Sequence, residues 1–431
     1  MTLGGSLRAW RMAGPLKREA ELYARPPADL AGFQLARLNA GWAESLVRSP
    51  WARAMQKRLD LPGKFESWDD LAARVPVQTK ADLRLDLAAA EQSGEPVLWR
   101  ATGGTTAQPM RFPVFKSETV EAGLDLWVGR GRLGITPADK LFMIWGHALM
   151  FGTGPKAALI RMKRRLSDAV VGYRRWNAYR LSTDDLRRAG DALTASGARY
   201  VIGYSCALDR LARANADRAA AFAGLKLKAV IATAEGLPRD DSRDVISATF
   251  GCPLVMEYGS VETGAIAYER PGGGYDAFWA RHRLELGEAV GAGRALIVTS
   301  LGARALPLLR YAIGDTVTPG ALDGVTGFAS VGGRVNDAVI LPDGTPIHSE
   351  AFTHVLRDLN GVRGYQIVGK AGGGIPTMRY EADAPLADET EAKLRERLAR
   401  IDPALRDAPL ERVDAIAPSA AGKHQMVVQA P

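Results

Sequence analysis

The chain has 431 residues, and 56 lysines and arginines stand against 48 aspartates and glutamates, so its formal net charge is +8 at pH 7. This length fits two or three domains, and 47% hydrophobic residues with 24% charged residues exclude disorder over most of the chain. Two cysteines exclude a disulfide framework and favour a reducing, cytoplasmic location, and no apolar run is long enough for a membrane span.

The basic charge is spread along the chain rather than gathered in a stripe. We therefore expect no nucleic-acid partner, and we interpret the run RMKRR at Arg161–Arg165 as a solvated face. Anionic small molecules such as nucleotides suit this charge equally well. The first residues are basic without an apolar core, so we expect no secretory signal.

Residues 1–95 are predicted to be a mostly helical lead-in. Ser67 with Asp70, and Thr79 with Asp82, have the spacing of helix capping boxes that precede apolar residues. The next segment, VLWRATGGTTAQPMRFPVF, predicts two strands around a glycine-threonine turn, and residues 117–135 predict a helix.

From residue 180 onward, predicted strands alternate with predicted helices. The strands are 199–204, 225–234 and 253–258, and the helices are one capped by Ser182 or Thr183, 206–216 and 238–250. This alternation predicts an α/β fold with a mainly parallel sheet flanked by helices. Ligands bind beyond the carboxyl ends of such strands, so the loops after Ala234 and Tyr258 are candidate sites.

The texture of the sequence changes after residue 334. Residues 284–333 are rich in strands and glycine, whereas the rest predicts a strand pair that turns at Asp343-Gly344, a helix, a charged helix over 387–401 and a short terminal strand. We therefore expect a large domain over 1–334 and a small α+β domain over 335–431.

Four short segments have the composition of ligand-binding loops. In Thr102–Thr106 (TGGTT), two glycines allow close approach of the backbone to an anion, although an ordinary hairpin turn explains the segment as well. Tyr258 at a strand end could stack on a base, and Glu262 could hold Mg²⁺; the alternative is a turn with an exposed glutamate. Asp315 could accept both hydroxyls of a ribose, and Lys423 could meet a phosphate, although each residue singly is more often a turn or surface residue.

Together these segments resemble the adenylate-forming superfamily of acyl-CoA synthetases, peptide-synthetase adenylation domains and luciferases, and more closely its phenylacetate–CoA ligase branch. The resemblance runs from about residue 65 to the C-terminus, and the matching segments are FESWDDLAARVPVQTKADLR, TGGTTAQP, MEYGSVETG, ALPLLRYAIGD and GGRVNDAVI. It implies a large AMP-binding domain followed by a small, mobile domain that carries a catalytic lysine.

The resemblance also implies a role for each matching residue. The implied catalytic residues are Lys423, Thr106 and Glu262, of which Glu262 is also the Mg²⁺ ligand. The implied nucleotide-binding residues are Thr102, Gly103, Gly104, Thr105, Thr106, Ala234, Glu235, Glu257, Tyr258, Gly259, Asp315 and Arg334. Asp337 falls at the hinge between the domains, and the candidate acyl pocket consists of Trp145, His147 and Tyr204. For His147 alone, a core histidine is the more common interpretation.

The activity that the resemblance implies is ATP-dependent activation of a small carboxylic acid. The acid forms an acyl-adenylate with release of pyrophosphate, and the acyl group then passes to CoA, so the implied cofactors are ATP, Mg²⁺ and CoA. Charge develops on phosphoryl oxygens, which requires cations and N–H donors rather than a strong base. Homodimers occur among similar proteins, so the resemblance allows a homodimer.

The sequence departs from the family pattern at several positions. Ala107-Gln108-Pro109 stands where Gly-Lys-Pro is common, Val261 replaces a hydroxyl residue, the hinge pair is Asn336-Asp337, and Ala312-Ile313 lacks a frequent arginine. Two alternatives therefore stay open: transfer of the adenylate to an amine or hydroxyl instead of CoA, and a degenerate protein that only binds a nucleotide or adenylate.

A serine hydrolase is a further alternative. Gly203-Tyr-Ser205-Cys-Ala207 follows a strand and precedes a helix, as a nucleophile elbow does, and Asp315 and His348 follow in the matching chain order. In the simpler interpretation, Ser205 caps the next helix.

Overall fold

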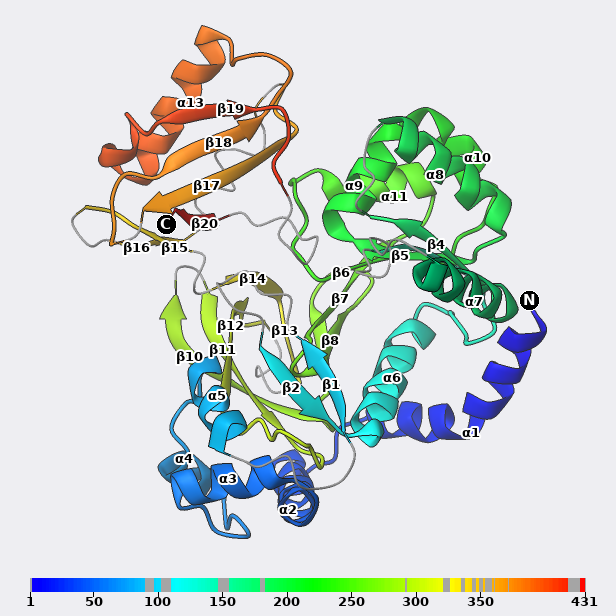
Figure 1. Cartoon of the computed structure of the whole chain (residues 1–431), viewed down its shortest axis with the longest axis vertical. Coiled ribbons are helices and arrows are strands. Elements are labelled where there is room, and N and C mark those ends of the chain that lie inside the picture. Colours follow the sequence, from blue (N-terminus) through cyan, green and yellow to red (C-terminus); the bar gives the residue numbers. More distant parts are fainter. Residues whose placement is uncertain are drawn as a thin grey trace.

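The computed structural model of the chain describes residues 2–89, 97–101, 110–145, 155–178, 183–290, 293–320, 326–334, 338–342, 346–348, 352, 359, 361–370, 372–417 and 427–430. Figure 1 shows helices and strands arranged in several lobes, with the C-terminal strands apart from the large sheet.

The N-terminal part is helical, as predicted. Its helices are α1 (Leu3–Ala24), α2 (Leu30–Arg48), α3 (Pro50–Leu59), α4 (Trp68–Arg74) and α5 (Lys80–Ala89). Ser67 caps α4, since its hydroxyl accepts from the Asp70 N–H at 3.0 Å. Before α5, the Thr79 N–H donates to Asp82 Oδ2 at 2.7 Å and the Asp82 N–H donates to Thr79 Oγ1 at 3.4 Å, which is the reciprocal capping box that the sequence predicts.

An eight-stranded sheet forms the centre of the molecule, in the order β13-β9-β8-β7-β6-β5-β3-β4. Its strands are β3 (Leu141–Trp145), β4 (Tyr173–Asn177), β5 (Tyr200–Tyr204), β6 (Val230–Thr233), β7 (Leu254–Ser260), β8 (Gly264–Glu269), β9 (Tyr275–Ala277) and β13 (Gly327–Phe328). The pairs from β4 through β7 are parallel, which confirms the mainly parallel sheet, and the pairs beyond β7 are antiparallel.

Helices cover this sheet (Figure 1). They are α6 (Lys116–Gly131), α7 (Pro155–Val171), α8 (Thr183–Ser196), α9 (Ser205–Ala214), α10 (Ala219–Ala223) and α11 (Ser242–Phe250), with a 3₁₀ turn at Ala216–Arg218. Buried side chains of α8, α9 and α11 pack with those of β5 and β6, for example Leu208, Leu211 and Phe250. Burial of this apolar surface is the main stabilising contribution of the layer.

Three predicted boundaries differ from the structure by four or five residues. The strand expected over 225–234 is only Val230–Thr233, because Lys226 has φ +50° and turns the chain after α10. The helix expected over 238–250 begins at Ser242, and the helix expected over 117–135 ends at Gly131. Local pattern places these elements correctly but not their ends.

A second, four-stranded antiparallel sheet has the order β10-β11-β12-β14, and a separate hairpin pairs β1 with β2. The strands are β10 (His282–Val290), β11 (Gly293–Ser300), β12 (Tyr311–Thr318), β14 (Ser330–Arg334), β1 (Leu98–Ala101) and β2 (Arg111–Val114). The hairpin confirms the two strands predicted around the glycine-threonine turn, and its Phe112 and Val114 share a core with the N-terminal helices.

After residue 334 the chain builds a sheet of its own, in the order β19-β18-β17-β20, beside the small β15-β16 hairpin. The elements are β15 (Ala338–Ile340), β16 (Pro346–His348), β17 (Gly364–Lys370), β18 (Thr377–Glu381), α13 (Asp388–Ile401), a 3₁₀ turn (Pro403–Leu405), β19 (Leu410–Val413) and β20 (Val427–Ala430). These confirm the predicted strand pair, charged helix and terminal strand. The helix expected after the strand pair, like Asp343-Gly344, lies outside the described residues.

The C-terminal sheet has a separate apolar core. Its buried cluster draws on residues from Val339 to Val427, and the larger residues include Phe352, Tyr365 and Leu398. No helix in the described part of the chain is both long and apolar enough to cross a membrane.

His282 makes the stability of the fold dependent on pH. Its ring is 4% exposed, and Nε2 lies 3.0 Å from the Ala265 carbonyl oxygen. Burial lowers the pKa of His282 to about 3, and the Arg304 guanidinium adds to the effect. Since the unfolded imidazole titrates near pH 6.5, the unfolded chain gains a proton between roughly pH 6.5 and pH 3 that the folded chain excludes. The free energy of unfolding is therefore unaffected by protonation of this group above about pH 6.5, and it falls as the pH drops from about 6.5 toward 3.

We expect His282→Gln, which keeps a neutral donor for Ala265, to remove this dependence. Below about pH 6, the free energy of unfolding of the wild type should fall by up to about 1.4 kcal/mol per pH unit more than that of the variant. Urea denaturation between pH 4 and pH 8 measures the two slopes. If the free energies of unfolding of the wild type and the variant changed equally with pH across this range, His282 would not be the source of the pH dependence.

Candidate functional site

The candidate residues at strand ends lie in one row across the central sheet. Tyr204 pairs with Thr233 in the β5–β6 register, and Thr233 pairs with Glu257 in the β6–β7 register. Trp145 ends the neighbouring strand β3, and its ring centroid lies 4.6 Å from that of Tyr204. The carboxyl ends of parallel strands meet at one edge, so the structure brings the candidate pocket residues beside the loops after β6 and β7.

The loop after β6 begins with a strained residue. Ala234 has φ +74°, a conformation that costs a non-glycine residue about 1 kcal/mol or more. The next residue, Glu235, accepts from the Cys206 N–H through Oε1 at 2.9 Å, at the start of α9. These contacts hold the loop against the N-terminus of α9.

Ser205 is not placed as a nucleophile. It is fully buried, and its hydroxyl donates to the Glu235 carbonyl oxygen at 2.7 Å. It does not cap α9 either, because the residue in the cap position is Tyr204. Ser205 therefore ties the loop to the helix, and the geometry contradicts the hydrolase alternative.

A hydrogen bond joins two of the predicted motifs. The Tyr258 hydroxyl, on β7, donates to Asp315 Oδ2, on β12, at 2.8 Å, across a separation of 57 residues. The Tyr258 ring packs edge-on against Phe328, with centroids 5.9 Å apart. Asp315 is in turn the register partner of Arg334 on β14, whose side chain lies outside the described part. The candidate adenine and ribose residues thus belong to one cluster.

Two further motif residues have structural partners. Glu257 pairs with the half-buried Arg130 of α6, with Oε2 and Nη2 3.0 Å apart. A Cβ on Gly259 would lie 2.2 Å from the Gly264 carbonyl oxygen, so only glycine fits there. The sequence did not predict a role for Arg130, because a basic residue in the last turn of a helix is common and does not identify its partner.

Glu262 lies beside a cation that the sequence analysis missed. Its side chain is 9% exposed, and Oε1 lies 3.0 Å from Lys80 Nζ at the start of α5. The Arg304 guanidinium donates to the Glu262 carbonyl oxygen and ion-pairs with Glu118, with Nε and Oε2 3.2 Å apart. Lys80 is the residue after Thr79, which caps α5. The capping pattern predicts the helix but not that Lys80 contacts Glu262.

The remaining candidates lie outside the described residues. They are Thr102, Gly103, Gly104, Thr105, Thr106, His147, Asp337 and Lys423. Their roles stay predictions.

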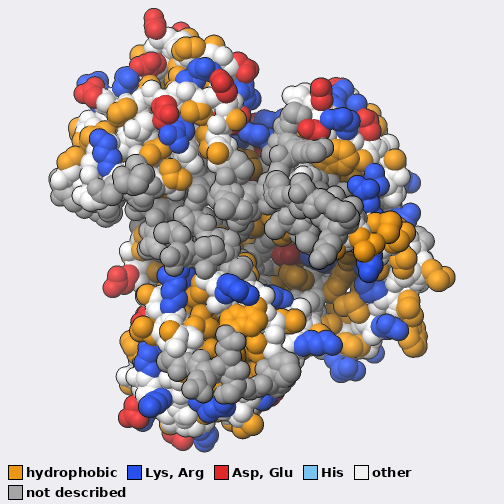
Figure 2. Space-filling model, viewed as in Figure 1, with side chains coloured by type: hydrophobic (Ala, Val, Ile, Leu, Met, Phe, Trp, Pro, Cys, Tyr) orange, Lys and Arg blue, Asp and Glu red, His pale blue; other side chains and the backbone are white. Residues whose placement is uncertain are grey.

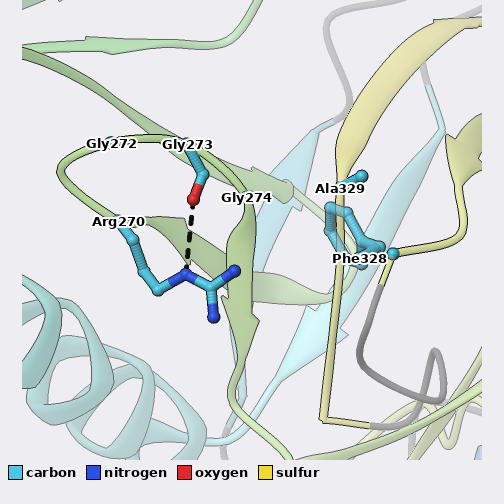
Figure 3. Close-up of a pocket in the computed structure, with 7 residues that line it drawn as sticks. Arg270, Gly272, Gly273, Gly274, Phe328 and Ala329 are labelled. Carbon is cyan, nitrogen blue, oxygen red and sulfur yellow. Dashed lines mark hydrogen bonds between the residues drawn. The ribbon is translucent and has the colours of Figure 1, made fainter.

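A hollow of about 280 Å³ lies apart from these residues, at the turn between β8 and β9. Figure 3 shows Arg270 and the glycines of this turn on one side and Phe328 and Ala329 on the other. The Arg270 Nε donates to the Gly273 carbonyl oxygen at 3.3 Å. None of the predicted site residues lines this hollow, although Phe328 connects it to the Tyr258 ring.

Comparisons with known proteins bear on the chain as a whole. No protein-family model matches it. Protein CapK of Staphylococcus aureus is 25% identical over 248 residues, which are 57% of this chain and 53% of that protein. The match thus spans about half the length of this curated relative.

Solved structures match over more of the chain. A 2-hydroxyisobutyryl-CoA ligase in the postadenylation state, in complex with 2-HIB-AMP, matches with a TM-score of 0.70 and 18% identity over 94% of this chain and 90% of that one. The same ligase in the thioesterification state matches with a TM-score of 0.59. An anthranilate CoA ligase in complex with anthranoyl-AMP matches with a TM-score of 0.54 and 18% identity over 79% of this chain and 68% of that one.

At 18% identity, these structural matches show the fold. Membership of the phenylacetate–CoA ligase branch stays a prediction. The large α/β part and the additional C-terminal sheet both agree with the resemblance that the motifs indicated. The chain therefore has the fold of the adenylate-forming acyl-CoA ligases.

Proposed function

We propose that the chain activates a small carboxylic acid with ATP, releases pyrophosphate and passes the acyl group to CoA. The observation that carries this proposal is the hydrogen bond between Tyr258 and Asp315, which unites the adenine and ribose motifs at the carboxyl edge of the sheet. Solved ligases with the same fold hold acyl-adenylates. The phenylacetate–CoA ligase-like branch belongs to the same proposal.

The cluster fits an adenosine. Tyr258 offers a ring at a strand end, held edge-on by Phe328, and Asp315 offers a carboxylate for ribose hydroxyls. Ala234, with its left-handed backbone, turns the main chain at this edge of the sheet, and Gly259 lets the backbone of β8 pack closely against the end of β7. We assign the phosphates to the loop Thr102–Thr106 and the adenine to the loops after β6 and β7.

The Glu262 carboxylate fits a hard cation, because it is a buried anionic oxygen donor whose Oε1 lies 3.0 Å from Lys80 Nζ. Mg²⁺ held there would neutralise charge on the phosphate oxygens. Gln108 stands where the family commonly has a lysine, so the phosphate loop lacks one positive charge. We propose that Lys80, whose Nζ lies 3.0 Å from the Glu262 carboxylate, supplies that charge instead. Val261, the other departure beside the site, packs against the core of the N-terminal helices.

Lys423 is proposed to stabilise the negative charge that develops between the substrate carboxylate and the α-phosphate. In this proposal the lysine belongs to a small domain that begins near residue 335 and rotates about Asp337. The contacts between the described residues of the two parts are polar: Arg210 Nη2 lies 3.2 Å from Glu381 Oε1, and the Arg239 guanidinium donates to the Val362 carbonyl oxygen at 2.7 Å. Such an interface suits a domain that moves.

The acid pocket is proposed at Trp145, Tyr204 and His147. The Trp145 and Tyr204 rings lie in tilted contact at the ends of β3 and β5, and Tyr204 is 6% exposed. An aromatic or compact acyl group suits such a wall.

The experiment that tests the proposal is carboxylate-dependent pyrophosphate release from ATP, with and without CoA, across aryl, short-chain and long-chain acids. Release with one acid class supports adenylation, and acceleration by CoA together with a thioester product supports the ligase. Release that ignores CoA and responds to an amine or hydroxyl supports the alternative acceptor. ATP binding without release across the panel would favour a binding protein and contradict the enzyme.

Tyr258→Phe tests the shared cluster. Loss of the hydroxyl removes its hydrogen bond to Asp315 but keeps the ring, so we expect the dissociation constant for ATP to rise by about 5- to 10-fold. Isothermal titration measures the constant. Tyr275→Phe is the matched control, because it removes a hydroxyl from a ring that stacks on Phe328 and packs edge-on against Tyr258 in the same aromatic cluster. Equal effects of both substitutions would argue against a role for the hydroxyl.

We also propose a cytoplasmic location, which suits two free cysteines. Burial raises the pKa of Cys206 well above its ordinary value and that of Cys252 to about 12, so both are structural thiols. A homodimer stays a prediction, which sedimentation equilibrium tests.

A further inference from the structure

Helix α7 turns its apolar side to the solvent. Leu159, Met162, Leu166 and Val170 are 47%, 53%, 62% and 59% exposed. Their spacing of three and four residues places them in one stripe along the helix. A helix that packs on a globular core normally buries such a stripe.

Among the described side chains of α7, those opposite this stripe are Arg164, Asp168 and Val171, and they face the protein. Arg164 and Asp168 are half-buried, and Asp168 Oδ2 lies 2.7 Å from the Arg175 Nε of β4. The Asp168 side chain is only 14% exposed. The usual orientation of an amphipathic helix is therefore inverted, and core packing does not account for the apolar stripe.

Helix α1 continues the same surface. Leu3, Leu7 and Trp10 are 93%, 48% and 76% exposed, again at spacings of four and three. A Cβ on Gly4 would lie 2.6 Å from Val170 Cγ1, so the two helices are in close contact. We call Leu3, Leu7, Trp10, Leu159, Met162, Leu166 and Val170 the α1–α7 surface. Figure 2 shows apolar and basic side chains together along the right-hand edge, where Figure 1 places these helices.

The charges around this surface are mainly positive. The exposed cations on the described parts of the two helices are Arg11, Lys17, Arg18, Lys163 and Arg165. The acidic groups of these helices have basic partners: Glu19 pairs with Arg281, Asp168 with Arg175 and Glu21 with Lys17. The surface thus combines an apolar stripe with an excess of positive charge.

We propose that the α1–α7 surface docks on an anionic lipid bilayer. Apolar side chains with a tryptophan would enter the interface, and the flanking lysines and arginines would contact lipid phosphates. A second copy of the chain fits less well, because a two-fold contact through this surface would oppose the same cations. The proposal is independent of the catalytic role, since none of these residues belongs to the candidate site.

The test is co-sedimentation of the full chain with phosphatidylcholine vesicles and with vesicles of 70:30 phosphatidylcholine to phosphatidylglycerol, at low and high salt. We expect binding to the anionic vesicles that weakens by about 10-fold or more at high salt. Binding that is equal for both compositions, or absent from both, would overturn the proposal.

Two pairs of substitutions locate the contact. Met162→Asp with Leu166→Asp removes the stripe, and Lys163→Glu with Arg165→Glu reverses the charge; each pair should lower vesicle binding by about 10-fold or more. The matched controls are Val47→Asp, an exposed apolar residue on α2, and Lys57→Glu with Arg397→Glu, exposed cations elsewhere. Unfolding midpoints verify that all variants fold.

Either of two results with these variants would overturn the proposal. One is unchanged vesicle binding by both surface variants. The other is a wild-type dimer that the Met162 and Leu166 substitutions convert to a monomer without any vesicle binding, which would assign the surface to a second copy.

Discussion

Lys423→Ala is expected to lower carboxylate-dependent pyrophosphate release by about 100- to 1,000-fold while ATP still binds. A cation that contacts the developing charge stabilises the transition state more than the bound ground state, so its loss reduces the rate of adenylation rather than nucleotide affinity. Initial rates of pyrophosphate release and titration calorimetry with ATP measure the two quantities.

Lys393→Ala is the control for this substitution. Lys393 lies on α13 in the same part of the chain, and its Nζ pairs with the exposed Glu389 at 2.7 Å. Loss of such a surface pair should leave both rate and affinity unchanged. Full activity of Lys423→Ala would remove the lysine from the mechanism, and a loss of ATP binding would make it a ground-state ligand instead.

Glu262→Gln is expected to lower the rate of pyrophosphate release at physiological Mg²⁺ concentration by about 100-fold or more. We also expect the variant to need a higher Mg²⁺ concentration than the wild type to recover activity. The amide keeps the shape of the side chain but loses the charge that a hard cation requires. The stability should change little without metal, because Lys80 is about a third exposed and water can solvate its ammonium group. Mg²⁺ titrations of rate and of the unfolding midpoint separate the two effects.

Lys80→Ala and Glu285→Gln complete the comparison. If Glu262 only anchors Lys80, the Lys80 and Glu262 variants should lose the same activity with the same Mg²⁺ dependence. If Glu262 holds the metal, only its own variant shifts the Mg²⁺ requirement. Glu285→Gln controls for loss of an ion pair, since Glu285 pairs with Arg310 Nε at 3.1 Å outside the candidate site.

The sequence by itself determined the type and order of the elements. The capping boxes at Ser67 and Thr79, the alternation of strands and helices from residue 180, and the charged helix near the C-terminus all depend on residues a few positions apart, which is the range over which backbone capping and side-chain periodicity act. The five motif segments pointed to the superfamily fold for the same reason, since each is a short strand end or turn. Element ends were less accurate, as the short β6 shows, because tertiary packing sets where a strand stops.

Only the tertiary structure decided which side chains meet. Tyr258 and Asp315 lie on different sheets, Glu257 reaches Arg130 across 127 residues, and Glu262 meets Lys80 of the N-terminal lead-in. The sequence also indicated a solvated basic run at Arg161–Arg165, but it could not show that α7 packs through Asp168 and turns its leucines outward. An amphipathic pattern identifies two faces of a helix, whereas the free energy of packing the whole chain selects which face is buried.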